Sequence, residues 1–235
     1  MYTIPEVLAT IETNQWVMIC TVIGWIGGSV QFLEAIRLTW RDKVIGLPLG
    51  YVFAIVAHDS NVALNHDLWF NTVHHWYFET TWYMYPFWVL VEITVIIWFV
   101  RLARAEVAPH LPAPAFYAIC AAFQIMAFIL FHFTESLIAD PLGIVGLAIS
   151  QIVNVVFMIP LLLRRRSTRG QSRILGWAIL LGPGSIGLLQ SAAMVPALRT
   201  PLYYAMVACM TALSIGYLIL LEYYRQREKA ALVGT

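Results

Sequence analysis

Charge is scarce in this chain of 235 residues. Charged side chains make up 11% of the sequence and hydrophobic ones 60%, and the mean hydropathy is +0.75. A soluble domain carries about 25% charged residues, which it needs to cover a surface that faces water. The net charge of +1 gives no reason to expect a nucleic-acid partner. The composition therefore predicts an integral membrane protein.

Cysteine is also scarce, and the start of the chain has no basic residue. Cys20, Cys120 and Cys209 fall inside apolar runs at unrelated spacings, so we expect neither a disulfide framework nor a metal site from them. Residues 1–15 do not have the positive charge of a signal peptide. We therefore expect the first apolar run to remain in the protein as a helix.

Long apolar runs recur along the whole sequence. A helix needs about 20 mostly apolar residues to cross a hydrocarbon core about 30 Å thick. We predict an all-α fold, an integral membrane bundle of seven transmembrane helices that forms a single domain over residues 1–235. Residues 65–79 and 101–113 should be longer connections, and Gly182-Pro183-Gly184 should kink or break the sixth span. The predicted spans are 16–36, 46–64, 80–100, 114–135, 141–163, 174–198 and 202–222.

Basic residues predict the orientation of the bundle. If the spans alternate, 13 of the 14 Lys and Arg residues lie on one side of the membrane, and Arg199 is the exception. Cytoplasmic loops carry the excess of Lys and Arg. We therefore expect the N-terminus outside and the C-terminus in the cytoplasm, which requires an odd number of spans.

Several polar side chains are predicted to lie at membrane depth. A charged group there costs about 2.5–3.5 kcal/mol on insertion scales, so each needs a partner or a function. They come from six predicted spans and lie mostly in the outer half, which predicts a polar cavity open to the outer side or to lipid. These side chains are His58, Asp59, Glu92, His132, Glu135, Gln151, Gln190 and Ser214.

Helical spacing groups some of these residues on shared faces. Asp59 is rotated by about 100° from His58, so we do not expect both to point at one atom. Each group also has a structural alternative, since a buried acid can bond a facing helix and a residue at a span end can be solvated. The shared faces are Tyr85, Trp88 and Glu92; His58, Asn61 and Asn65; and His132 with Glu135.

Short motifs occur in a fixed order along the chain. Gly24-Trp25 is followed by Arg41-Asp42 and by Gly-Leu-Pro-Leu at 46–49, and Arg-Ser-Thr-Arg-Gly-x-Ser occupies 166–172 with Trp177 beyond. The last span carries Tyr217 and ends in a basic tail. In this order the motifs resemble the integral membrane terpene cyclases of fungal meroterpenoid and indole-diterpene pathways, which have bacterial relatives in indole-sesquiterpene pathways.

This resemblance implies catalytic positions and also shows two departures. The family's catalytic Glu in the second span is matched by Asp59, and the preceding Trp by His58. The family's second acid, an Asp in the last span, falls at Ser214.

The resemblance and the buried polar groups together lead to one expected function. We expect a membrane cyclase that starts a cationic cascade on a lipophilic prenyl or epoxyprenyl chain, with membrane lipid as its other partner and with no metal or cofactor. No Asp-rich diphosphate-binding motif is visible, which argues against a cyclase that ionises a diphosphate. Asp59 would be the acid, with His58 or His132 tuning or recycling its proton. Glu92 would be a second acid or would stabilise cations. The expected substrate-binding residues are Trp25, Tyr85, Trp88, His132, Glu135, Gln151, Ser214 and Tyr217.

Two other functions remain open at this stage. A proton-coupled small transporter or sensor could use the same carboxyl groups as a relay. A metal-dependent membrane hydrolase of the ceramidase-like type would also need a His-x-x-x-His pair on its last helix, but the chain has no His after His132. Its candidate ligands are His58, Asp59, His66, His74, His75 and His132.

Overall fold

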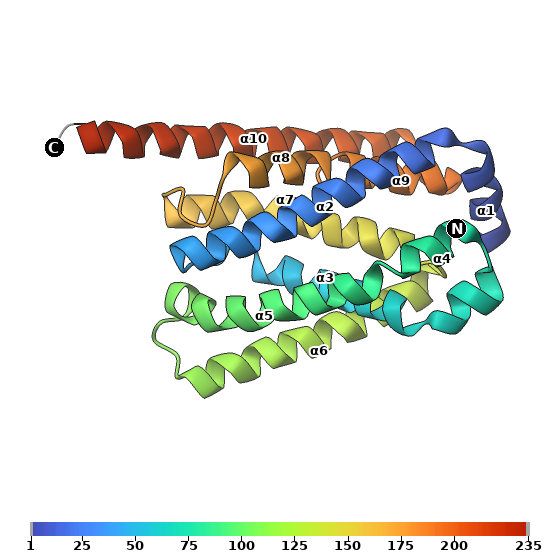
Figure 1. The fold of residues 1–235 in the computed structure, drawn as a ribbon, viewed down its shortest axis with the longest axis horizontal. Helices are drawn as coiled ribbons and strands as arrows, with labels where there is room; N and C mark the ends of the chain where they lie inside the picture. Colours follow the sequence, from blue (N-terminus) through green and yellow to red (C-terminus); the bar gives the residue numbers. More distant parts are fainter. Residues whose placement is uncertain (1, 234–235) are drawn as a thin grey trace.

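The structure, a computed structural model, describes residues 2–233 and contains helices and no strand in that range. The long helices run roughly along one axis, with α10 along one side of the bundle and α6 on the opposite side (Figure 1). In chain order the elements are α1 (Ile4–Thr13), α2 (Gln15–Asp42), α3 (Leu49–Leu64), the π-helical η1 (Leu68–Val73), α4 (Trp76–Trp82), α5 (Tyr85–Val107), α6 (Ala113–Ile138), α7 (Ile144–Arg165), α8 (Arg173–Leu181), α9 (Ile186–Met194), the 3-10 turn η2 (Pro196–Leu198) and α10 (Pro201–Val233).

Six of the helical segments in the described part are long and apolar enough to cross a membrane, as in a multi-pass membrane protein. They are Gln15–Asp42, Trp76–Val107, Ala113–Ile138, Ile144–Arg165, Arg173–Met194 and Pro201–Leu232. The predicted count of seven spans is not confirmed, because α3 has 16 residues and a span needs about 17 or more. Its neighbours α5, α6 and α7 cover α3, so that most of its side chains are buried.

The outward faces of the bundle are apolar. Large side chains such as Phe123, Leu90 and Ile219 are 60%, 66% and 67% exposed. An apolar surface of this extent is unfavourable in water and favourable against lipid tails. The composition and the surface therefore lead to the same class of protein.

At one end of the bundle, short elements cover the helix ends. We call it the capped end; it consists of α1, η1, α4 and the α6–α7 connection (Figure 1). The Tyr2 hydroxyl donates a hydrogen bond to Asp140 Oδ1 and accepts one from the Leu142 N–H at 3.1 Å. Asp140 Oδ2 accepts from the Gly146 N–H at 2.8 Å. The prediction of a long loop at 65–79 is wrong, since η1 and the start of α4 occupy most of it.

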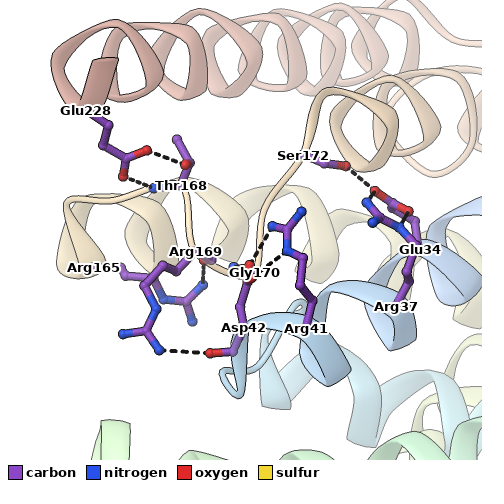
Figure 2. Close-up of polar contacts among 10 residues, drawn as sticks. All are labelled: Glu34, Arg37, Arg41, Asp42, Arg165, Thr168, Arg169, Gly170, Ser172 and Glu228. Atoms are coloured by element: carbon purple, nitrogen blue, oxygen red, sulfur yellow. Dashed lines mark hydrogen bonds and ion pairs between the residues drawn. The ribbon is translucent and has the colours of Figure 1, made fainter. Parts of the chain in front are cut away.

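The opposite end, here called the basic end, is where the α7–α8 loop is tied to α2 and α10 (Figure 2). Asp42 accepts hydrogen bonds from Arg41 and from the Gly170 N–H at 2.6 Å. Glu228 of α10 accepts the Thr168 N–H at 2.7 Å. Gly170 has φ +70°, and a Cβ there would lie 3.0 Å from a backbone carbonyl oxygen. The loop motif at 166–172 therefore forms a structural clamp.

The predicted break in the sixth span is confirmed. α8 ends at Leu181 and α9 begins at Ile186. The backbone groups freed by the break are paired again, because Gly184 N–H donates to the Ile179 carbonyl and Gly187 N–H to the Gly182 carbonyl, both at 2.7 Å. Such pairing is what allows an interrupted helix inside a bilayer.

Candidate functional site

A cavity of about 120 Å³ lies inside the bundle toward the capped end. Its walls come from α2, α3, α4, α5 and α7 and from the break between α8 and α9. Seven of the eleven predicted site residues line it: Trp25, His58, Asp59, Tyr85, Trp88, Glu92 and Gln151. The prediction that Tyr85, Trp88 and Glu92 share one helix face agrees with this placement.

His58 and Asp59 form a hydrogen-bonded pair on α3. The distance from His58 Nδ1 to Asp59 Oδ1 is 2.5 Å, and the two residues are 1% and 3% exposed. Although the two residues are rotated by about 100° around the helix, they lie close enough to bond each other. Asp59 therefore has a specific hydrogen-bond partner in the cavity wall.

Glu92 is buried beside this pair. It is 1% exposed, and its carboxyl group interacts with the Asp59 carboxyl of α3. Gln31, also on the cavity wall, is fully buried and interacts with the Tyr51 hydroxyl. The two carboxyl groups, the amide and the hydroxyl therefore form one polar cluster on the wall of the cavity.

Aromatic rings form one wall of the cavity. Trp25 of α2 and Trp88 of α5 meet edge to face, with ring centroids 6.0 Å apart. Tyr85 stands edge to face with Trp88 at 5.9 Å and lies 6.1 Å from the His58 ring. The faces and edges of these rings are therefore next to the acids.

Two tyrosines of this site were not predicted from the sequence. Tyr51 lines the cavity and interacts with the carboxyl groups of Glu92 and Asp59. It lies seven residues before His58 and eight before Asp59, about two helical turns away, and this spacing could have indicated it. Tyr77 lies in the segment predicted as a loop. Its hydroxyl hydrogen-bonds to Thr21 Oγ1 at 2.7 Å and accepts from Gln190 Nε2 at 3.2 Å.

Four of the predicted site residues do not line the cavity. The His132 side chain is 62% exposed and lies 3.6 Å from Glu135, whose carboxylate accepts from Asn61 Nδ2 at 3.0 Å. Ser214 donates to the Met210 carbonyl of its own helix at 2.9 Å. Tyr217 is buried and donates to Gln171 in the α7–α8 loop. A direct contact with a ligand in this cavity is therefore not available to them.

The histidines of the hydrolase alternative are dispersed. Among the described residues, no three His, Cys, Asp or Glu side chains are grouped so that they could hold a metal ion. The His66 and His74 side chains are 54% and 80% exposed. The metal ligands considered for the hydrolase alternative are thus not brought together among the described residues.

No family model matches this chain, and neither a curated protein nor a solved structure resembles it detectably. The function of the chain is therefore inferred from its site and its sequence motifs.

Proposed function

We propose that this chain is a membrane-embedded terpene cyclase that protonates a lipophilic prenyl or epoxyprenyl chain. The observation that carries the proposal is the placement of two buried carboxyl groups, Asp59 and Glu92, against a wall of aromatic rings in one cavity. The sequence motifs support the same class. Burial favours the protonated form of a carboxyl group, which is the form a proton donor needs.

Asp59 supplies the proton in this proposal. The proton adds to an epoxide oxygen, whose C–O bond breaks, or to a terminal alkene carbon. Either event leaves a carbocation. The next alkene donates its π electrons to form a C–C bond, and the last cation loses a proton to a carboxylate. The product is an isomer of the substrate, and the enzyme regains the proton that it gave.

His58 and Glu92 have different tasks in this scheme. With its proton on Nδ1, His58 donates to Asp59 Oδ1 and stabilises the carboxylate that remains after proton transfer. In this proposal Asp59 and Glu92 share one proton, because two neighbouring negative charges in a low-dielectric interior are costly. Glu92 can accept the final proton and return it to Asp59.

The aromatic wall fits the intermediates of such a cascade. A desolvated cation over a ring face gains about 0.5–2 kcal/mol. Trp25, Tyr85 and Trp88 offer that surface next to the acids. The role of the wall is to stabilise positive charge as it moves along the prenyl chain.

A proton-coupled transporter is the second candidate, and one observation favours the cyclase over it. A transporter needs polar access from both sides, whereas an apolar core fills the bundle between the cavity and the basic end. That core includes Leu38, Leu47, Val95, Phe99 and Leu162, each no more than 1% exposed. Such packing suits a reaction chamber that is closed toward the basic end.

We also infer seven crossings with the N-terminus outside. α3 is shorter than a full span, but its neighbours shield it from lipid, so its ends need not reach the headgroups. The positive-inside rule then places the basic end in the cytoplasm.

The central test is the variant Asp59→Asn in purified protein in nanodiscs, with prenylated and epoxyprenylated aromatic substrates and products identified by mass spectrometry. We expect turnover to fall by about 10²–10⁴ because the acid is lost while the shape is kept. Asp67→Asn is the matched control, since that side chain is 93% exposed. If Asp59→Asn turns over substrate at the wild-type rate, Asp59 is not the proton donor. If the wild-type protein converts none of these substrates, the protein is not a cyclase of this class.

A further inference from the structure

The two helices that carry the aromatic wall pack against different neighbours. α2 packs along α8 and α9, α5 packs along α3, and the contact between α2 and α5 is sparse. Ring pairs join them, with Trp40 and Trp98 stacked at 4.8 Å and Trp25 and Trp88 edge to face at 6.0 Å. In Figure 1, α2 crosses the bundle obliquely and diverges from α5 toward the capped end.

The more exposed residues of the cavity wall lie mostly on α2 and α5. Most of the lining residues are buried, but seven are half-buried, and five of the seven lie on α2 and α5. These five are Gly24, Trp25, Gly28, Tyr85 and Trp88. Leu147 and Gln151 of α7 are the other two. The wall between α2 and α5 is therefore the least covered part of the cavity.

Gly28 marks the open part of this wall. A Cβ at Gly28 would meet no atom within 4 Å, whereas a Cβ at Gly27 would lie 2.8 Å from the Gly182 backbone and one at Gly24 would lie 3.3 Å from Gln190. The space beside Gly28 is thus not filled by a neighbouring helix.

The gap faces the hydrocarbon region. Trp25 lies ten residues after the start of α2 at Gln15, which is a rise of about 15 Å and about half of the hydrocarbon thickness. The flanking side chains are exposed and apolar, with Ile26 at 59%, Phe87 at 57% and Leu90 at 66%. A molecule that passes between α2 and α5 would come from the lipid tails.

We infer that the substrate's prenyl chain enters the cavity sideways from the bilayer, between α2 and α5 over Gly28, with the Trp25–Trp88 ring pair as the gate. The identity of the ligand rests on the proposed function, but the gap itself does not. Entry from lipid also spares the prenyl chain exposure to water, which is unfavourable for apolar groups.

The test places a block in the gap after the protein has folded. Gly28→Cys is made in a Cys209→Ser background, because Cys209 is the exposed native thiol. The protein in nanodiscs is alkylated with a bulky lipid-soluble maleimide, and a farnesyl diazirine is then photo-cross-linked to it. Gly216→Cys on α10 is the matched control, since a Cβ there also meets nothing within 4 Å.

We expect alkylation at position 28 to reduce cross-linking of the cavity peptides by about tenfold and alkylation at position 216 to leave it unchanged. A thiol at position 28 that resists the reagent, or unchanged cross-linking after its alkylation, would overturn the entry route. The result also separates the two proposals. Blocked cross-linking in a protein without turnover keeps the route and rejects the cyclase, whereas turnover that survives alkylation keeps the cyclase and rejects the route.

Discussion

Glu92 and Ser214 are both buried, but their surroundings predict different effects of their substitution on turnover. Glu92 lines the cavity beside the Asp59 carboxyl, whereas Ser214 lies outside the lining and donates to the Met210 carbonyl. We expect Glu92→Gln to reduce turnover about as severely as Asp59→Asn, by about 10²–10⁴. Ser214→Ala should cost under about tenfold, since a neutral hydrogen bond contributes about 1 kcal/mol.

Both variants are measured at matched expression in nanodiscs, with Glu12→Gln as the control for the loss of an exposed carboxyl group. The Glu12 side chain is 66% exposed. A nearly silent Glu92→Gln together with a crippled Ser214→Ala would reverse the assignment.

Charged residues of the site could be predicted from the sequence, and most of the tyrosines could not. Asp59 and Glu92 stand out because a carboxyl group in a bilayer is costly and needs a reason. Tyr51 and Tyr77 do not stand out among 11 tyrosines in an apolar chain. Tyr217 came from the family resemblance and Ser214 from its predicted depth as well as the resemblance, and neither lines the cavity.

Among the helices, the approach of α2 to α8 depends on glycine. A Cβ at Gly27 would lie 2.8 Å from the Cα and N of Gly182, whereas one at the adjacent Gly28 meets nothing within 4 Å. We expect Gly27→Ala to force these backbones apart and to cost about 1–3 kcal/mol. Gly28→Ala should leave Tm unchanged in a thermal scan in detergent, and equal Tm values for the two variants would contradict the packing argument.

At the capped end, Tyr2 ties the start of the chain to the α6–α7 connection. Burial, and then the Asp140 carboxyl, raises the pKa of Tyr2 above its usual value of 10.0, so the hydroxyl stays protonated at neutral pH. Tyr2→Phe leaves Asp140 Oδ1 without this donor, and we expect a cost of about 1–3 kcal/mol.

The effect of Tyr2→Phe is read as a lower Tm at pH 7, with Tyr83→Phe as the control because Tyr83 is 65% exposed. A raised pKa in the folded state means that the contribution of Tyr2 is complete below about pH 10 and is lost as the pH rises further. An unchanged Tm for Tyr2→Phe would show that the tie is not stabilising.

Element boundaries could be predicted where apolar length or proline marked them. The break at residues 182–184 followed from its Gly-Pro-Gly composition. The elements η1 and α4 did not, because residues 65–79 have no clear apolar period. A local bond from the His74 N–H to the Trp69 carbonyl at 3.1 Å and a tie from Trp69 Nε1 to the Val62 carbonyl at 2.9 Å hold η1 in place.

For the whole molecule, the two ends differ in chemistry. The basic end carries ion pairs such as Arg165–Glu106 and Arg173–Glu222, at 2.7 and 2.6 Å. At the capped end, Arg199 donates to the carbonyls of Ala192 and Ala193 near the end of α9. One basic residue is therefore bound to a helix end at the capped end. The remaining 13 of the 14 lie in or beside the helix segments of the basic end.

This asymmetry predicts the orientation in the membrane. Lys and Arg near span ends are retained in the cytoplasm during insertion, so the basic end should face inward and the N-terminus outward. Thr3→Cys and Ala231→Cys, each in a Cys209→Ser background, report the two ends because both positions are exposed. A membrane-impermeant maleimide should label Cys at position 3 in intact cells and Cys at position 231 only after permeabilisation. Labelling of position 231 in intact cells would refute the orientation, and labelling of both positions in intact cells would refute an odd number of crossings.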